Sequence, residues 1–303
     1  MTMTHRAAAR ALFIFITLIG SVVAGAARAT AAPLTFSYVY TGNGIAGAGI
    51  LTTTDTLVGG AYTATDIEGL RNTASVSALY APGAFLGNDN LVFPSSPSID
   101  YAGISYAAGG LGYNLYNNSI CGTNQDYELA SGGGCAAGSP ITLLMAPFTP
   151  APGAQYFAFT YTGSGIAAAG LFSTDGTMTG GAYTVDGVLG LRNGQNITGL
   201  FAPDTYLGND NRLFPQHPNV DYAGISFSTA GGGFNLYNNL LCGTDQDYEL
   251  PAGGGCAAGS PITLTVEALD TTAVPEPATL TLLGLGLAGA RLRRRAAGSR
   301  RSH

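Results

Sequence analysis

Residues 35–41 read Thr-Phe-Ser-Tyr-Val-Tyr-Thr, and a matching stretch, Tyr-Phe-Ala-Phe-Thr-Tyr-Thr, occupies residues 156–162. In both stretches an aromatic ring stands at every second position, from Phe36 to Tyr40 and from Phe157 to Tyr161. Apolar residues at a period of two predict a half-buried β-strand, because successive side chains of a strand point to opposite faces. The same strand therefore occurs twice in one chain.

The repeat extends far beyond this strand. Residues 35–145 match residues 156–266 at a constant offset of 121, and 64 of the 111 pairs are identical. A period this long exceeds that of solenoid repeats and fits tandem domains of ordinary size. Between the copies, Pro147-Phe-Thr-Pro-Ala-Pro152 predicts an extended, semi-rigid spacer. A single fused domain with pseudo-twofold symmetry is the alternative.

Each copy is predicted to be all-β, because many short strand patterns alternate with Gly-rich turns and no clean helical period occurs in the body. Ala108-Gly109-Gly110 predicts a turn, and Asp175-Gly176 predicts a hairpin. The fold class is therefore two tandem duplicated antiparallel β-sandwich or β-barrel domains, with the choice between sandwich and barrel left open. Besides the opening strand, the first copy has predicted strands at Ile45–Thr53, Tyr62–Ile67, Asp100–Tyr106, Leu111–Asn117 and Ile141–Leu144. The first of these is rich in Gly and Ala, so another backbone or a bulky side chain could approach it closely.

The body of the chain is strongly acidic. Residues 30–273 contain 17 Asp and Glu, three Arg and no Lys, a formal charge of −14, because nine of the 12 cationic residues lie nearer the two ends. Nucleic acid binding requires Lys and Arg to neutralise phosphates, so nucleic acid is excluded as a partner. An acidic body also disfavours anionic membrane surfaces and favours solubility at a cell surface.

The N-terminus has the pattern of a secretory signal peptide. The basic residues His5, Arg6 and Arg10 precede an apolar run at 11–23, and small residues around Ala29 and Ala31 offer a cleavage site. We therefore expect residues 1–31 to form a signal helix that directs export.

The C-terminus carries a second targeting pattern. Val274-Pro275-Glu276-Pro277 begins a short apolar run that ends at Ala290, and arginines follow at Arg291, Arg293, Arg294 and Arg295. Seventeen residues make a helix of about 26 Å, slightly short of a bilayer core, and the arginines would stay on the cytoplasmic side. On length alone, an ordinary C-terminal anchor is the alternative.

This order of Pro-Glu-Pro, apolar helix and arginine cluster resembles the PEP-CTERM sorting signal of Gram-negative bacteria. The resemblance implies that residues 274–277 are the recognition element for a membrane exosortase, a transient partner, and that Arg291 to Arg295 stop transfer through the inner membrane. The implied location is an inner-membrane intermediate followed by the cell surface, outer envelope or extracellular space. The predicted organisation is signal peptide 1–31, first β-domain 33–146, linker 147–152, second β-domain 153–267, linker 268–273 and sorting segment 274–303.

The four cysteines fall two per copy. Cys121 is expected to pair with Cys135, and Cys242 with Cys256, because each domain had to fold alone before it was duplicated. An exported chain reaches an oxidising compartment, where such bridges persist. Each would close a 15-residue loop, worth about 3 kcal/mol in the chain-entropy model.

The most polar shared loops are Gly-Asn-Asp-Asn at 87–90 and 208–211. Asp89 and Asp210 could supply oxygen ligands to calcium, although Asn and Asp also favour tight turns. No other cofactor is expected. Asp126 and Glu128, repeated as Asp247 and Glu249, would share one face of a strand and could act as a paired acid and base, as in a glycosidase. A solvated loop is the alternative.

The remaining chemistry-bearing residues are few. Arg71 and Arg192 are the cations that both copies share, and each is expected to pair with a carboxylate. The residue of the first copy that corresponds to His217 is Ser96, and no nucleophile motif of a hydrolase accompanies His217. We therefore expect a non-enzymatic envelope protein with a structural or adhesive role at the surface or in an exopolysaccharide matrix. The alternative is a carbohydrate- or calcium-binding module with one site per repeat.

Overall fold

A computed structural model describes residues 33–130, 132, 137–251 and 258–271. These residues belong to one compact unit, Pro33–Ala273. The predicted signal helix and the predicted C-terminal apolar helix lie outside the described residues. Within the described ranges, no helix is long and apolar enough to span a membrane.

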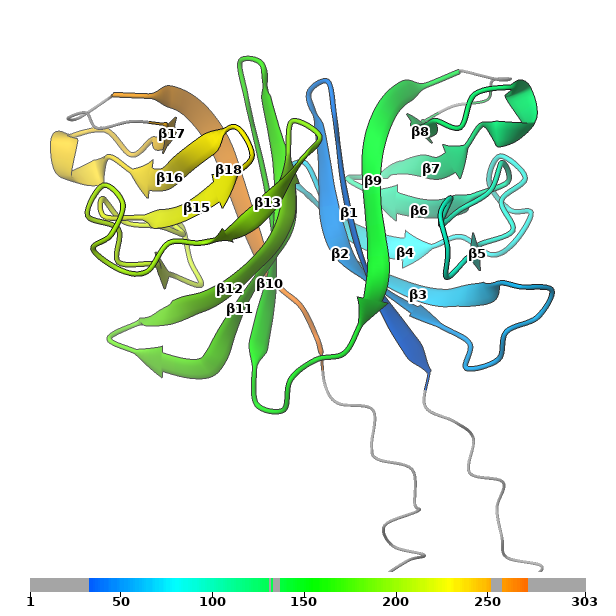
Figure 1. The fold of residues 1–303 in the computed structure, drawn as a ribbon, viewed down its shortest axis with the longest axis horizontal. Coiled ribbons are helices and arrows are strands. Elements are labelled where there is room, and N and C mark those ends of the chain that lie inside the picture. The colour runs from blue at the N-terminus through cyan, green and yellow to red at the C-terminus, as the bar shows by residue number, and fades with distance from the viewer. Residues whose placement is uncertain (1–32, 131, 133–136, 252–257, 272–303) are drawn as a thin grey trace, which may run out of the picture. The chain divides into compact units, whose positions relative to one another are not determined.

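The first copy forms a closed, eight-stranded antiparallel β-barrel (Figure 1). Its strands follow one another around the ring in the order β2-β1-β9-β8-β7-β6-β4-β3, and pairing of β3 with β2 closes it. A short strand, β5, pairs with β3, and a 3₁₀ turn, η1, follows β7. The bounds are β1 Leu34–Gly42, β2 Ile45–Thr53, β3 Tyr62–Arg71, β4 Ala74–Leu79, β5 Leu91–Val92, β6 Ile104–Ala108, β7 Leu111–Asn117, η1 Ser119–Cys121, β8 Asp126–Leu129 and β9 Ser139–Phe148.

The second copy repeats this ring, and β11–β12 pairing closes it. The choice between sandwich and barrel is thereby settled in favour of two closed barrels in tandem. The bounds are β10 Gln155–Gly163, β11 Ile166–Thr179, β12 Ala182–Arg192, β13 Gln195–Leu200, β14 Arg212–Leu213, β15 Ile225–Thr229, β16 Gly232–Asn238, η2 Leu240–Cys242, β17 Asp247–Leu250 and β18 Ser260–Ala268.

Glycines in β2 let large rings fill the barrel. A Cβ at Gly47 would lie 2.3 Å from the Tyr40 ring, and one at Gly49 would lie 1.9 Å from the Glu68 carbonyl oxygen. The sequence prediction that bulky groups approach this strand closely is therefore confirmed. The aromatic residues of β1 point inward and lead a core of buried side chains in each barrel.

The prediction that β1 is half-buried is wrong. Its outward-facing residues Ser37, Val39 and Thr41 are as buried as its inward-facing rings. The outer face of β1–β3 packs on that of β10–β12 and forms a third apolar core, shared by the two barrels. Its buried members are Val39, Ala46, Ala48, Ile50, Leu70, Ala158, Ala169, Leu171, Leu191 and Leu269.

The segment between β9 and β10 comprises residues 149–154 and so begins two residues later than the predicted linker. β9 continues through Pro147 and Phe148, two residues into the predicted linker, and the Phe148 ring packs edge-on against Tyr156 at the start of β10. Hydrogen bonds also join the barrels directly: Gly194 N–H donates to Thr41 Oγ1 over 2.9 Å, and Thr160 Oγ1 donates to the Asn72 carbonyl. The barrels are thus packed against each other as well as joined in sequence.

Most strand predictions hold, and two need correction. Ile45–Thr53 and Leu111–Asn117 match β2 and β7. The Asp175-Gly176 hairpin is wrong, because both residues lie at an irregularity within β11 and the chain turns at Gly180-Gly181, both with positive φ. The strand predicted from Asp100 begins at Ile104, because the Asp100 carboxylate accepts the N–H groups of Ala102 and Gly103.

Candidate functional site

A buried ion pair lies inside the first barrel. Arg71, at the end of β3, donates to both Glu128 oxygens from Nε and Nη2, over 3.1 and 2.7 Å. The hydroxyls of Tyr40 and Tyr106 contact each other and donate to Glu128 Oε1 over 2.9 and 3.0 Å. Burial works to lower the pKa of Arg71, but its bonds to Glu128 outweigh this and raise it. The guanidinium also covers the Tyr113 ring, 4.1 Å from its centroid.

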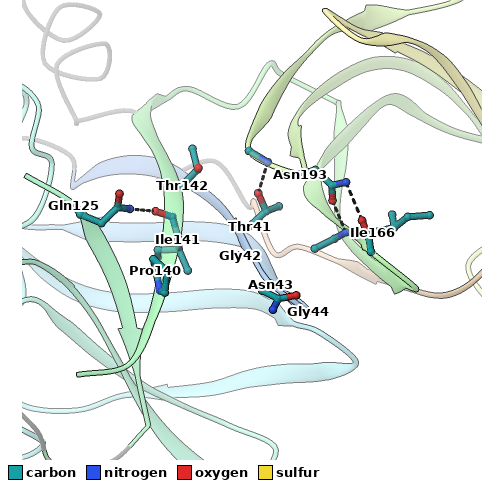
Figure 2. A pocket seen from close by; sticks show the side chains of 13 residues that line it. Thr41, Gly42, Asn43, Gly44, Gln125, Pro140, Ile141, Thr142, Ile166 and Asn193 are labelled. Carbon is teal, nitrogen blue, oxygen red and sulfur yellow. Dashed lines mark hydrogen bonds between the residues drawn. The ribbon is translucent and has the colours of Figure 1, made fainter. Parts of the chain in front are cut away.

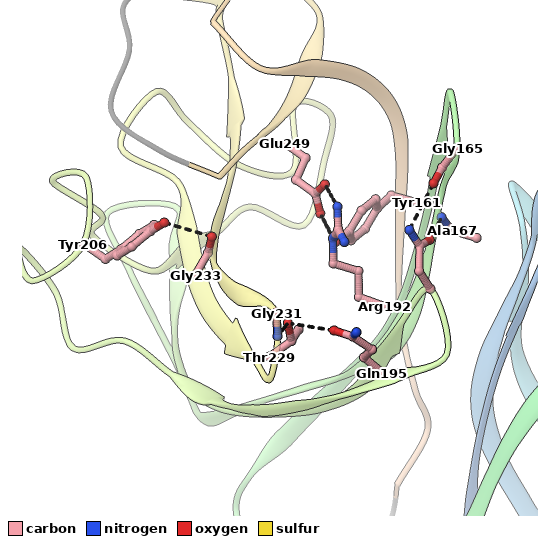
Figure 3. A network of polar contacts seen from close by, with 11 residues as sticks. Tyr161, Gly165, Ala167, Arg192, Gln195, Tyr206, Thr229, Gly231, Gly233 and Glu249 are labelled. Atoms are coloured by element: carbon pink, nitrogen blue, oxygen red, sulfur yellow. Dashed lines mark hydrogen bonds and ion pairs between the residues drawn. The ribbon is translucent and has the colours of Figure 1, made fainter.

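The second barrel repeats the pair with fewer hydroxyls (Figure 3). Arg192 donates to the two Glu249 oxygens over 2.7 and 2.6 Å, and the Tyr161 hydroxyl donates to Oε1. The Tyr106 position is occupied by Phe227, which is fully buried. The prediction that both shared arginines pair with carboxylates is therefore confirmed.

These pairs decide the role of the predicted acidic motifs. Asp126 and Glu128 share one face of β8, as predicted, whereas the ring of Tyr127 stacks on Tyr116 on the other face. Asn117 Nδ2 donates to Asp126 over 2.8 Å, and Glu128 is held by Arg71. Both carboxylates are therefore engaged in structural contacts.

The Gly-Asn-Asp-Asn loop is held from within. Asn88 Nδ2 donates to Asn90 Oδ1 over 2.8 Å, Asn90 Nδ2 donates to the Tyr80 carbonyl, and Asn90 Oδ1 accepts the Ser105 N–H. Both amides are buried, and the second copy repeats the network with Asn209 and Asn211. The asparagine side chains therefore stabilise the loop through buried hydrogen bonds.

Asp89 and Asp210 remain the two predicted calcium ligands. Asp89 Oδ1 accepts the Leu91 N–H over 3.1 Å. Burial raises the pKa of the Asp89 carboxyl, the charge of nearby Asp100 adds to this rise, and the hydrogen bond from Leu91 opposes it. Burial likewise raises the pKa of Asp210, whose charged neighbour is Asp221. The described residues contain no group of three or more His, Cys, Asp or Glu placed to hold a metal. Calcium binding therefore stays a prediction.

The cysteine pairing also stays a prediction. Cys121 and Cys242 end the turns η1 and η2, where a left-handed glycine follows each of them. Their predicted partners, Cys135 and Cys256, lie outside the described residues.

His217 is placed in an exposed loop of the second barrel. Its Nε2 atom lies 3.2 Å from Asp245 Oδ1, and Asn238 joins Asp245 to the buried Asp247 by two hydrogen bonds. The first copy has Ser96 and Asn124 at the positions of His217 and Asp245, so this contact belongs to one barrel only.

A hollow at the junction of the barrels was not foreseen from the sequence (Figure 2). It encloses about 410 Å³ and is bordered by the β1–β2 turn and the start of β9 from the first barrel. The β10–β11 and β12–β13 turns of the second barrel complete it. Its residues lie far apart in the sequence, so only the packing of the barrels brings them together. The lining side chains that carry polar groups are Thr41, Asn43, Gln125, Thr142 and Asn193.

Comparison with protein families identifies the end of the chain. A family model for the PEP-CTERM protein-sorting motif matches residues 273–295. The chain carries a PEP-CTERM protein-sorting motif, which supports its being an exosortase substrate. The match covers the predicted recognition residues Val274 to Pro277 and the arginines 291–295, all outside the described residues.

The motif implies an exported PEP-CTERM protein with a membrane-anchored intermediate and a transient contact with an exosortase. Comparison with curated proteins and with solved structures finds no match to the chain. The role of the two barrels must therefore be argued from their own residues.

Proposed function

We propose that this PEP-CTERM protein is a non-catalytic structural or adhesive component of the cell surface or of an extracellular polysaccharide matrix. The observation that carries the proposal is the sorting motif at 273–295, which delivers the barrels outside the cytoplasm. Its apolar segment anchors the chain in the inner membrane before processing, and the mature barrels then reach the outer envelope or beyond.

The barrels themselves support a structural role. Their interiors are filled by aromatic rings and by ion pairs that hold the arginines at 71 and 192. The carboxylates Glu128 and Glu249, the strongest candidates for acid–base chemistry, serve these pairs. A packed interior and a shared core between the barrels suit a rigid unit displayed at a surface.

Sorting is tested with the full chain in its own host. Cells expressing the chain or a Glu276→Ala variant are fractionated, and the barrels are detected in inner membrane, envelope and medium. We expect the natural chain to be processed and to leave the inner membrane, whereas the variant accumulates there unprocessed. Pro152→Ala, which changes an exposed proline outside the motif, serves as control. Equal processing of Glu276→Ala and the natural chain would contradict exosortase sorting.

The structural role is tested by deletion. Loss of the gene should weaken attachment of cells to each other or to the matrix, and the natural chain should restore it whereas Glu276→Ala should not. Unchanged adhesion and matrix composition in the deletion strain would remove this part of the proposal.

A second candidate function is binding of calcium or carbohydrate at one site per repeat. It is favoured by the partly buried carboxyls of Asp89 and Asp210, each beside a second Asp. Calorimetric titration with calcium, with Asp89→Ala and Asp210→Ala as controls, tests the metal. Absence of both heat and a shift in melting temperature would end the calcium hypothesis.

A further inference from the structure

The hollow between the barrels combines polar side chains with close backbone approach (Figure 2). Asn43 and Gly44 are exposed at the β1–β2 turn, and Gly165 and Gly194 border the hollow from the second barrel. Gly194 has φ +76°, and a Cβ there would lie 2.9 Å from Thr142 Oγ1 of the first barrel. The absence of a side chain at Gly194 therefore allows the two barrels to approach closely at this side of the hollow.

Two of the lining side chains hold the walls in place. Asn193 Oδ1 accepts the Ala167 N–H and its Nδ2 donates to the Gly165 carbonyl, which fixes two turns of the second barrel to each other. Thr41 Oγ1 accepts the Gly194 N–H across the junction. These bonds preorganise the hollow, because its two walls are fixed before any ligand arrives.

Other lining groups remain to meet a ligand. Gln125 donates from Nε2 to the Ile141 carbonyl over 2.6 Å, which orients the side chain and leaves Oε1 as an acceptor. The Asn43 carboxamide and the Thr142 hydroxyl belong to exposed residues at the rim. Pro140 adds exposed apolar surface between them, whereas Ile141 and Ile166 are buried beneath the lining. The hollow thus presents mainly amide and hydroxyl groups.

The lining narrows the class of ligand. No charged side chain lines the hollow, so it offers no ion pair to a phosphate, a carboxylate or an ammonium group. Both barrels are closed rings, so the strands bordering the hollow have no free edge to which a peptide strand could be added. The acidic body repels polyanions. A neutral ligand with many hydroxyl groups matches amide and hydroxyl partners best.

We propose that the inter-barrel hollow binds a segment of neutral polysaccharide through Asn43, Gln125 and Thr142. This inference rests on the proposed placement of the protein at a surface or matrix, and it names the class of matrix molecule that the protein contacts. The site is single in each molecule, because the two barrels contribute different walls to it. Duplication thereby produced a site that neither barrel has alone.

The repeat supplies matched controls for this site. Gln246 donates to the Asp247 and Ile262 carbonyls, as Gln125 does to Asp126 and Ile141, but it does not line the hollow. Thr263 is likewise the exposed counterpart of Thr142 outside the hollow. The two glutamine variants therefore remove the same structural contacts, and only Gln125→Ala removes a ligand contact.

The test uses the purified full chain in detergent and an array of glycan fragments. Neutral probes are dextran, galactan and β-glucan fragments, and anionic probes are alginate and polygalacturonate fragments. We expect binding to at least one neutral probe and to no anionic probe. Gln125→Ala should weaken it about fivefold, the effect of about one hydrogen bond, and Gln246→Ala should leave it unchanged. Thr142→Tyr, which fills the hollow, should abolish binding, whereas Thr263→Tyr should not.

Several outcomes overturn the proposal. They are binding to no neutral probe, preference for the anionic probes, or equal weakening by Gln125→Ala and Gln246→Ala. Asn43→Ala changes only an exposed turn residue, so it can replace Gln125→Ala if the glutamine variants fold poorly. It should also weaken binding to the neutral probe, because Asn43 is one of the proposed binding residues. Processing of the chain in cells is read separately, so failure of glycan binding and failure of sorting are distinguishable.

Discussion

At the scale of single residues, the two copies form a natural comparison, because Glu128 accepts two tyrosine hydroxyls and Glu249 accepts one. Removing one partner of a buried ion pair leaves the other charge uncompensated and costs about 3 kcal/mol or more. Glu128→Ala also loses a second charge-assisted hydrogen bond, which the Tyr40–Tyr106 contact can replace only with a weaker neutral one, a net loss of about a further 1 kcal/mol. We therefore expect Glu128→Ala to destabilise the chain more than Glu249→Ala in urea unfolding. Equal losses would show that the Tyr106 bond contributes nothing.

Asp126 gives a pH dependence whose sign follows from its surroundings. Burial raises the pKa of its carboxyl, against the Asn117 hydrogen bond, which lowers it. The folded state then holds this proton more tightly than the unfolded state, so the stabilisation is complete below the ordinary pKa of about 3.9 and is lost as pH rises through the folded value. Asp126→Asn removes this loss.

The melting temperature of Asp126→Asn should therefore match that of the natural chain below about pH 4 and exceed it at about pH 7. Thr73→Asn at an exposed position, which changes no titrating group, serves as control and should keep a constant offset from the natural chain. A constant offset between Asp126→Asn and the natural chain at all pH values would contradict the assignment.

At the scale of elements, β2 depends on glycines that admit its neighbours. A Cβ at Gly49 would lie 1.9 Å from the Glu68 carbonyl oxygen on β3, the strand that closes the barrel. We expect Gly49→Ala to destabilise the chain by about 2 kcal/mol or more, because backbone rather than a flexible side chain must move. At Gly199, an added Cβ meets nothing nearer than 4.0 Å, so Gly199→Ala is the control. Similar melting temperatures for the two variants would refute the role of Gly49.

Strands β1 and β2 show which features of the fold can be predicted from the sequence. Alternation gives the strand and its inner face, and glycine content indicates close approach, because both are local properties of the chain. The second buried face of β1 was missed, since Val39 is covered by residues more than a hundred positions away. The hairpin at Asp175-Gly176 failed because Gly180-Gly181 offers two consecutive glycines for the turn. The hollow could not be predicted for a similar reason, because Asn43 and Asn193 line the same space only after both barrels have closed and packed.

At the scale of the whole molecule, the shared apolar core makes the barrels one unit, so we expect a single cooperative unfolding transition. Ala169 is fully buried in this core and packs among Val39, Ala48 and other apolar residues. Ala169→Asp would bury a carboxylate among them without a cation, at a cost of several kcal/mol.

Such a cost exceeds what a small interface can offset, whereas each barrel keeps its own interior core and ion pair. Calorimetry of Ala169→Asp should therefore show two separated transitions, or one broadened transition with a lower calorimetric cooperativity. Ala78→Asp places the same charge at an exposed position and should leave the single transition intact. If Ala169→Asp also unfolds in one sharp step, the barrels would have to be coupled by contacts other than this core, with the cross-barrel bonds of Thr41 and Thr160 as the next candidates.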